Sequence, residues 1–362
     1  MSQRLEKIHI EGYKSIKKMD LELKNINILI GANGSGKSNF VSIFKFLRQI
    51  VQQHLQVTIL QSGGDIDNFF YYGIKETELI NIQLDFSSNK YRLCLIPSGS
   101  SALFIRNEDI SIHYESDKEP SWENITLNAS ESRLENVAKK GGDSKYVYDA
   151  LKSWRVYHFH DTGETALVKR SGAINDNLFL REDGSNLAAF LYRMKIENIK
   201  YYERIVETIR LVVPMFNDFL LVPNLKNEER IRLEWFAKTS DMPFAAEQLS
   251  DGSLRFICLC VALLQPERPI IILLDEPELG LHPTAVKILA GLIRKASNFS
   301  QLIISTQSRE LIDEFQAENI VVVENEEGHS TFNRLHNEEL AYWTEKYSMA
   351  EIWDRNVIGG RP

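Results

Sequence analysis

The first part of the chain alternates apolar and polar positions and then changes to a helical period. Ile8 and Ile10 alternate with polar neighbours, and the apolar run 26–30 leads directly into a glycine-rich segment. These patterns predict strands, the last of which ends at the glycines. From Ser38 to Leu55 apolar residues recur every three or four positions, which predicts a helix of about five turns. The predicted order is therefore strand, glycine loop, helix.

Residues 60–160 have a different character. Apolar residues alternate with polar ones at 80–86 and 91–95, which predicts antiparallel strands joined by polar turns. The polar and acidic stretch 116–132 is expected to form an exposed loop. Helical periodicity returns over 186–212, and no internal repeat or heptad pattern is present.

The last third of the chain returns to an alternation of helices and strands. Helices are predicted at 253–264 and 283–296, and strands at 270–274 and 302–305. The strands are apolar on both faces, which indicates a mostly parallel sheet buried between helices. The fold class is therefore predicted to be α/β, with an antiparallel β lobe and a helical insertion.

The composition is ordinary for a globular protein, with 43% hydrophobic and 25% charged residues. No run approaches the roughly 20 apolar residues that a membrane-spanning helix needs, and the first residues lack the apolar core of a secretory signal. Cys94, Cys258 and Cys260 are too few for a disulfide framework, and we expect Cys258 and Cys260 to be buried side chains rather than ligands. These features predict a cytoplasmic protein with no membrane contact.

The charge gives no positive sign of nucleic-acid binding. The formal net charge is −8, and the lysines and arginines are scattered along the chain. Strong DNA binders usually carry a basic excess or a dense basic stripe. DNA as a partner therefore stays open but is not indicated by the charge.

The glycine-rich segment Gly31-Ala32-Asn33-Gly34-Ser35-Gly36-Lys37-Ser38 matches the pattern GxxxxGK[ST] in full. Its glycines let backbone N–H groups turn toward a phosphate, where the start of the following helix adds a favourable dipole. Lys37 would bridge the β- and γ-phosphates of ATP, and Ser38 would offer its hydroxyl to Mg²⁺. A chance Gly/Ser turn is a poor alternative, given the strand before and the helix after. With Asn39, this segment is the predicted nucleotide-binding loop.

Two carboxylates follow the apolar strand 270–274. The carboxyl ends of parallel strands are where open α/β sheets bind their ligands. Asp275 would hold Mg²⁺, and Glu276 would polarise the water that attacks the γ-phosphate. An acidic surface turn would be the simpler explanation if the nucleotide-binding loop were absent.

A segment before the helix at 253–264 defines the class further. Ser250 and Gly252 could donate hydrogen bonds to a phosphate, although Ser250 could equally be an ordinary helix N-cap. Placed shortly before Asp275, the segment resembles the signature of ABC ATPases, which caps the ATP held by a second subunit. The resemblance assigns this role in trans to Leu249, Ser250, Asp251, Gly252, Ser253 and Arg255. It extends to 278–282, which looks like the family's D-loop, and to 305–308, which looks like its switch loop.

The switch position departs from the family pattern. Gln307 stands where the family usually has histidine. A glutamine amide can donate a hydrogen bond to phosphate and accept one from water, but it cannot carry a proton. The catalytic residues predicted from the resemblance are Glu276, Lys37 and Gln307, and we expect slow turnover.

The spacing of the motifs indicates the branch of the superfamily. The signature begins 249 − 31 = 218 residues after the nucleotide-binding loop, which is too long for a compact transporter domain. The opening segment 8–15 resembles the start of RecF, SMC and OLD-type ATPases. The insertion lacks heptads, which favours an armless, RecF-like head. Segments 180–188, 248–256 and 352–362 resemble stand-alone bacterial ATPases described as predicted AAA-family members.

The resemblance implies a single ABC-type head over 1–362. Its expected lobes are a nucleotide-binding core at 1–60 and 265–336, a β-rich lobe at 61–160, a helical signature lobe at 161–264 and a tail at 337–362. The implied function is an ATP-gated homodimeric switch that acts with DNA or a protein effector, such as a nuclease encoded nearby, in DNA repair or phage defence. Alternatives are an ATP sensor with little turnover and, less favoured, the ATPase subunit of a transporter.

Two weaker candidates remain. His158 and His160 could be half of a metal site, but alternating strand residues explain them more simply, because no Cys/His pair with ligand spacing accompanies them. Gln61 is the nearest candidate by position for the family's ATP-coordinating glutamine.

Overall fold

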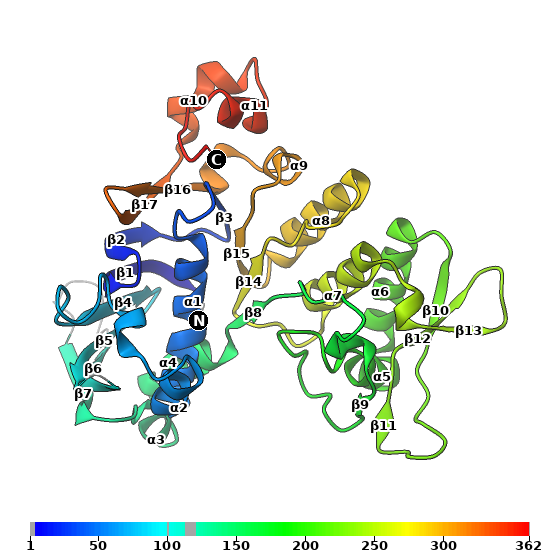
Figure 1. Ribbon diagram of the computed structural model, residues 1–362, viewed down its shortest axis with the longest axis horizontal. Helices are drawn as coiled ribbons and strands as arrows, with labels where there is room; N and C mark the ends of the chain where they lie inside the picture. The colour runs from blue at the N-terminus through cyan, green and yellow to red at the C-terminus, as the bar shows by residue number, and fades with distance from the viewer. Residues whose placement is uncertain (1–3, 100, 113–120, 362) are drawn as a thin grey trace. The chain divides into compact units, whose positions relative to one another are not determined.

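A computed structural model describes residues 4–99, 101–112 and 121–361 of the chain. These residues form two compact units. Unit 1 consists of Met1–Arg155 and Gln316–Pro362, and unit 2 of Val156–Phe315. In Figure 1, unit 1 is coloured from blue to blue-green and from orange to red, and unit 2 from green to orange.

Unit 1 contains a six-stranded antiparallel sheet in the order β2-β1-β4-β5-β6-β7. Its strands are β1 (Leu5–Tyr13), β2 (Ile16–Glu22), β4 (Ile80–Phe86), β5 (Asn89–Ser98), β6 (Ala102–Ile112) and β7 (Ser121–Ala129). Apolar residues alternate along these strands so that one face is buried, as in Ile80, Ile82 and Leu84. The antiparallel strands predicted at 80–86 and 91–95 are confirmed.

Unit 1 also contains three strands in the order β17-β16-β3: β3 (Ile26–Ile30), β16 (Ile320–Glu326) and β17 (His329–Arg334). β3 pairs with β16 in parallel, and all five of its residues are buried. The helices of unit 1 are α1 (Lys37–Val51), α2 (Leu55–Gln61), α3 (Leu134–Ala138), α4 (Asp143–Ser153), α10 (Asn337–Thr344) and α11 (Met349–Asp354), with 3₁₀ turns η1 (Ile66–Phe69) and η4 (Ala317–Asn319). β3, the glycine loop and α1 therefore follow one another as predicted.

Unit 2 is built around a parallel pair of buried strands, β14 (Ile271–Asp275) and β15 (Gln301–Ser305), with β8 (Arg155–Tyr157) beside β14. Its helices are α5 (Leu187–Glu197), α6 (Ile199–Val212), α7 (Asp251–Leu264), α8 (Pro283–Ala296) and α9 (Arg309–Ile312), with 3₁₀ turns η2 (Leu167–Lys169) and η3 (Ala246–Gln248). Two small antiparallel sheets contain β9 (Gly172–Ala173) with β11 (Arg230–Ile231), and β10 (Phe216–Leu220), β12 (Glu234–Ala237) and β13 (Pro243–Ala245).

Helix α7 is the core helix of unit 2. Every residue from Leu254 to Leu264 is buried, and α7 packs against α6 and α8. A helix that is apolar all round needs covering on all sides. This explains why Cys258 and Cys260 are buried and free, as predicted, and burial raises the pKa of the Cys258 thiol to about 12. Cys94 is also buried and free.

The structure corrects several predicted elements. The first helix ends at Val51 rather than Leu55, because Gln53 adopts a left-handed backbone (φ 63°) and a separate helix α2 begins at Leu55. The helical stretch 186–212 is split at Asn198 into α5 and α6. The expected loop at 116–132 is wrong for 121–129, which form β7, while 116–120 lie outside the described residues.

Helix α4 was not predicted. Its buried residues Val147, Tyr148 and Leu151 have helical spacing, but the helix lies within a region whose alternating apolar and polar residues otherwise predict strands. Among the described residues, no helix is both long and apolar enough to cross a membrane.

Candidate functional site

The predicted site residues fall into two groups, one in each unit. The group in unit 2 begins at the carboxyl end of β14, where Asp275 and Glu276 stand as predicted. Glu276 has a left-handed backbone (φ 41°), which is uncommon for a residue with a side chain and is concentrated at functional sites. Its N–H donates to the carbonyl of Ser305, so the pairing of β14 with β15 continues to this residue.

The two carboxylates are oriented by neighbours on the switch segment that follows β15. The hydroxyl of Ser305 donates to Oδ1 of Asp275. The amide Nε2 of Gln307 donates to Oε1 of Glu276 at 2.8 Å. Burial raises the pKa of Asp275, but hydrogen bonds with His158 and Ser305 outweigh it, so that the pKa lies below its usual value. Asp275 is therefore held as a carboxylate.

A third carboxylate ties the D-loop-like segment to the switch segment. Oε1 of Glu278 accepts hydrogen bonds from the hydroxyl of Thr306 (2.6 Å) and the backbone N–H of Gln307 (3.3 Å). Burial raises the pKa of Glu278 despite these bonds. The two segments of the predicted site thus support each other through one buried side chain.

The signature-like segment forms the start of α7. Ser250 is the N-cap, since its hydroxyl accepts a hydrogen bond from the N–H of Ser253 at 3.2 Å. Both Ser250 and Asp251 are exposed. A Cβ on Gly252 would lie 2.2 Å from the carbonyl oxygen of Gly280, so only glycine allows this close approach to the D-loop-like segment. Leu249 and Leu254 are buried beneath the helix start.

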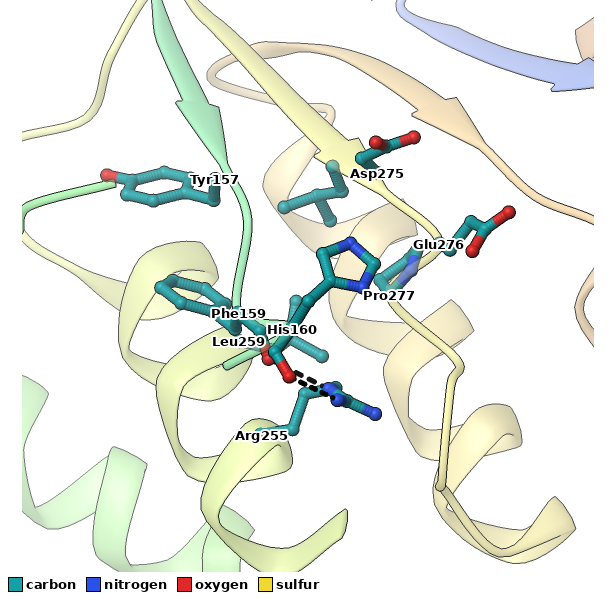
Figure 2. Close-up of a pocket in the computed structure, with 9 residues that line it drawn as sticks. Tyr157, Phe159, His160, Arg255, Leu259, Asp275, Glu276 and Pro277 are labelled. Atoms are coloured by element: carbon teal, nitrogen blue, oxygen red, sulfur yellow. Dashed lines mark hydrogen bonds between the residues drawn. The ribbon is translucent and has the colours of Figure 1, made fainter. Parts of the chain in front are cut away.

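The side chain of Arg255 points inward rather than to the surface. Only 9% of Arg255 is exposed, and its guanidinium donates to the carbonyl oxygens of Phe159 (2.9 Å), His160 (3.2 Å) and Leu279. Figure 2 shows the two bonds to the 159–160 segment. These contacts favour a role in positioning that segment over direct contact with a partner's nucleotide.

Sequence reasoning named His158 and His160 as a weak candidate but did not place them beside Asp275. The residues that line the small pocket in Figure 2 include His160, Asp275, Glu276 and Arg255. In that view the His160 ring projects toward the end of β14. Nδ1 of His158 lies 3.5 Å from Oδ2 of Asp275. The available signal was the HxH pattern after a short strand, but nothing in the sequence placed that strand beside β14.

The group in unit 1 is the nucleotide-binding loop between β3 and α1. Its glycines are required by close packing. A Cβ on Gly31 would lie 2.1 Å from the carbonyl oxygen of Val323, and one on Gly36 would lie 2.0 Å from Oγ of Ser330. Gly36 also has a φ of 111°, which L side chains rarely adopt. The loop therefore keeps the narrow backbone turn that a phosphate cradle needs.

The polar residues of the loop have distinct environments. Lys37 is buried, and its ammonium donates to the carbonyl oxygens of Gly31 (2.6 Å) and Ala32 (2.9 Å). Ser38 is exposed in the first turn of α1, and Asn33 and Gly34 are exposed at the loop's tip. Ser35 is buried. The cradle, the amino group and the free-standing hydroxyl fit a nucleotide phosphate with its cation.

Two further contacts fix the loop. Nδ2 of Asn39 donates to Oγ of Ser15 at 2.7 Å, and the Ser330 hydroxyl lies 2.6 Å from the carbonyl oxygen of Ser35. Asn39 therefore holds the start of α1 to the turn after β1. Gln61, the other glutamine candidate, is an exposed residue at the end of α2.

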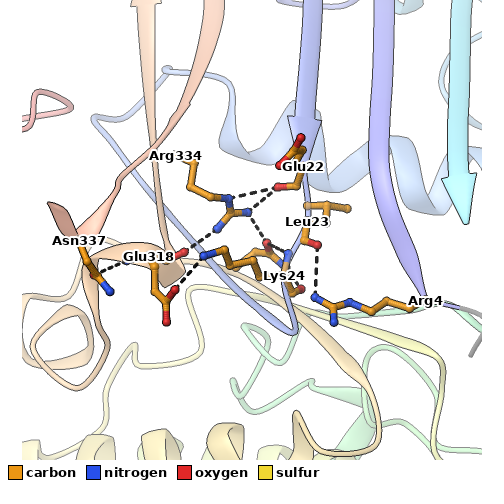
Figure 3. A network of polar contacts seen from close by, with 8 residues as sticks. Arg4, Glu22, Leu23, Lys24, Glu318, Arg334 and Asn337 are labelled. Carbon is orange, nitrogen blue, oxygen red and sulfur yellow. Dashed lines mark hydrogen bonds and ion pairs between the residues drawn. The ribbon is translucent and has the colours of Figure 1, made fainter. Parts of the chain in front are cut away.

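The strand that carries Ser330 is anchored at its other end by Arg334 (Figure 3). The Arg334 guanidinium donates to the carbonyl oxygens of Glu22 (2.8 Å) and Glu318 (3.0 Å) and to the side chain of Asn27 (2.5 Å). Burial lowers its pKa to about 10. Lys24 adds an ion pair with Glu318 at 2.9 Å. These bonds join the two chain segments that make up unit 1.

Comparison with known proteins identifies the class. Residues 26–313, well over half of the chain, match a protein family described as "AAA domain, putative AbiEii toxin, Type IV TA system". The chain belongs to this AAA-domain family. It is therefore a P-loop ATPase of the SMC/RecF/ABC class, as the sequence resemblance predicted. Membership implies a nucleotide substrate and, usually, Mg²⁺.

Solved structures agree on the fold. An SMC head bound to the C-terminal winged-helix domain of ScpA has a TM-score of 0.53 at 16% identity, covering 93% of this chain and 99% of that one. An SMC head with an extended coiled coil, bound to the C-terminal domain of ScpA and derived from Pyrococcus furiosus, has a TM-score of 0.53 at 17% identity, covering 94% and 98%. At this identity the likeness shows the fold alone, and it confirms the predicted α/β head. No curated protein matches the sequence.

Proposed function

We propose that this AAA-domain protein binds ATP with a divalent cation, hydrolyses it slowly, and acts as a dimerising switch. In this proposal two copies close on the nucleotide and separate after hydrolysis. The output passes to DNA or to a protein effector, such as a nuclease encoded nearby, in DNA repair or phage defence. ATP is the substrate, and Ser38 and Asp275 hold the cation, Mg²⁺ in the usual case.

The observation that carries the proposal is the geometry of the loop at Gly31–Ser38. Two of its glycines pack so closely that no side chain could replace them, and the exposed Ser38 stands at the start of a 15-residue helix. Helix starts of this kind favour negative charge, because their backbone N–H groups and dipole point at the ligand. Lys37, now bonded to two loop carbonyls, would exchange these bonds for β- and γ-phosphate oxygens.

Slow hydrolysis follows from the pairing of Glu276 with Gln307. The carboxylate would polarise the attacking water, and the amide fixes one of its oxygens at 2.8 Å. An amide cannot take up or release a proton as histidine can, so Gln307 would orient water and phosphate without sharing the proton. The oriented carboxylate supports turnover, and the missing proton carrier lowers its rate.

Dimerisation is supported by the exposed start of α7. Ser250 and Asp251 face solvent, and the backbone of Gly252 is fixed against Gly280. In the proposed dimer this segment caps the γ-phosphate held by the partner copy, which completes the site only on association. Light scattering should show that Glu276→Gln forms an ATP-dependent dimer, because two copies of the variant close on ATP but do not hydrolyse it.

Two matched variants make this test specific. Lys37→Ala should bind no ATP and stay monomeric. Ser250→Arg should bind ATP as a monomer but fail to dimerise, because the longer side chain would fill the space in which the start of α7 meets the partner's nucleotide. If Glu276→Gln stays monomeric with saturating ATP and Mg²⁺ while binding ATP normally, the shared site is wrong.

A second candidate function is an ATP sensor that binds without appreciable turnover, favoured by the amide at position 307. Phosphate release by the wild type, measured against Lys37→Ala, separates the two. A wild-type rate equal to that of the variant removes the enzyme and leaves the sensor. Binding of labelled DNA and co-purification with the product of the neighbouring gene, each with and without ATP, test the two proposed outputs.

A further inference from the structure

His158, His160 and Asp275 form a three-residue cluster in unit 2 with the composition of a metal site. One ligand atom from each residue lies within 4.8 Å of the other two. We propose that this cluster binds a divalent first-row transition metal, such as Mn²⁺, Co²⁺ or Zn²⁺, in preference to Mg²⁺. The part of this inference that concerns the nucleotide rests on the proposed function, because Asp275 is also the carboxylate assigned there to the nucleotide's cation.

The local backbone explains why both imidazoles lie on one side. His158 and His160 are two residues apart in the extended segment after β8, so they share a face. Phe159 lies on the opposite face, where it is buried and stacks on Tyr157 with ring centroids 5.4 Å apart. The two histidines are half-buried and exposed, respectively, and are accessible to an ion.

The segment is also held in place by its backbone. The N–H of His158 donates to the carbonyl of Glu182 at 3.0 Å. The guanidinium of Arg255 donates to the carbonyls of Phe159 and His160. A metal site gains affinity when its ligands need little rearrangement, and these bonds fix the position from which both rings extend.

The distances suit a site that tightens when an ion enters. Nδ1 of His158 lies 3.5 Å from Oδ2 of Asp275, at the long end of the hydrogen-bond range. In a tetrahedral site with metal bonds of about 2.1 Å, neighbouring donor atoms are about 3.4 Å apart. The His158–Asp275 pair already has this spacing, and rotation of the exposed His160 ring can bring in the third donor.

The carboxylate of Asp275 is also oriented as a metal ligand. Ser305 donates to Oδ1 of Asp275, which leaves Oδ2 directed toward His158. Bound metal ligands usually carry such an outer hydrogen bond, which fixes their orientation.

The donor set determines which metal fits. Mg²⁺ takes oxygen ligands almost exclusively, whereas imidazole nitrogen suits Zn²⁺, Co²⁺, Mn²⁺, Fe²⁺ and Ni²⁺. Two imidazoles and one carboxylate leave positions open for water or for phosphate oxygens. The site would therefore hold a cation without ATP and could offer it to a nucleotide, where the histidines would shift the metal preference away from Mg²⁺.

The test is a titration of the full-length, nucleotide-free protein with Co²⁺, whose visible absorption reports nitrogen ligation. The wild type should bind one Co²⁺ at the cluster, and excess Mg²⁺ should not displace it. His158→Gln and His160→Gln should each weaken Co²⁺ binding by about ten-fold or more. His336→Gln replaces an exposed histidine in unit 1 and serves as the matched control, with no expected change. Since His160 is exposed, His160→Gln should fold normally, which circular dichroism would verify.

Lys37→Ala separates the two proposals. It should abolish binding of a fluorescent ATP analogue and leave Co²⁺ binding intact. If the wild type binds no ATP, the proposed function is wrong, but the inference about the metal site still stands. The metal inference is overturned if Co²⁺ binds the wild type, His160→Gln and His336→Gln equally, if Mg²⁺ displaces it at similar concentration, or if no Co²⁺ spectrum develops.

Discussion

Replacing Arg255 with alanine should loosen the site in unit 2 by a measurable amount. Its guanidinium bonds to three backbone carbonyls, those of Phe159, His160 and Leu279. Hydrogen bonds to a charged donor contribute about 1.5–3 kcal/mol each. Part of this total is offset, because burial also penalises the guanidinium itself and thereby lowers its pKa. Water can also reach the exposed His160. We therefore expect a net loss of about 3 kcal/mol in the free energy of unfolding.

For a unit of this size, that loss corresponds to a fall of about 6–12 °C in the melting temperature of unit 2. Calorimetry measures the transition, and hydrogen exchange of the peptide covering 157–162 locates the effect. Arg255→Lys should fall between wild type and Arg255→Ala, since it keeps the charge but loses the planar fork. Arg232→Ala is the matched control, because Arg232 is an exposed arginine that forms a surface ion pair with Glu234. Equal melting temperatures and equal exchange for Arg255→Ala and Arg232→Ala would refute the positioning role.

Three further predictions follow from single contacts. Gly252→Ala should destabilise the protein by about 1–3 kcal/mol, since its Cβ would lie 2.2 Å from a backbone carbonyl oxygen. Gly291→Ala in α8, where nothing lies within 4 Å of the added Cβ, should stabilise it by about 0.5–1 kcal/mol. Thermal unfolding should therefore show a lower melting temperature for the first variant and a higher one for the second. Burial raises the pKa of the Glu108 carboxyl above its usual 4.5, so the folded protein favours the protonated form. The stability that this gives is fully present below pH 4.5 and is lost as the pH rises through the raised pKa. Glu108→Gln should therefore gain stability relative to wild type as the pH rises above 4.5, and a melting temperature that changes with pH in the same way in both proteins would contradict this. Gln307→Ala should lower phosphate release by about ten-fold or more while ATP affinity stays within about two-fold, because the amide orients Glu276; an unchanged rate would show that it does not.

Local sequence was sufficient for the parts of the protein whose geometry is local. The strand, glycine loop and helix from Ile26 to Val51 follow from a change in hydrophobic period and from glycines that permit a tight turn. The carboxylates at 275–276 follow from a buried strand that ends in acidic residues. Helix boundaries were less predictable, since Gln53 and Asn198 interrupt apolar periods that continue beyond them.

The order of the strands in the sheets and the contacts of the buried side chains could be learned only from the tertiary structure. In the sequence, His158 and His160 are alternating polar residues far from Asp275; they meet because β8 lies beside β14. In the same way the resemblance assigned Arg255 to the signature that acts on a partner's ATP, but the side chain is buried and binds the segment that carries the histidines. A hydrophobic period records which face of an element is covered, but not which element covers it. The sequence alone therefore determined that this chain belongs to the P-loop ATPases, and only the packing of unit 2 decided which side chains surround the carboxylates of Asp275 and Glu276.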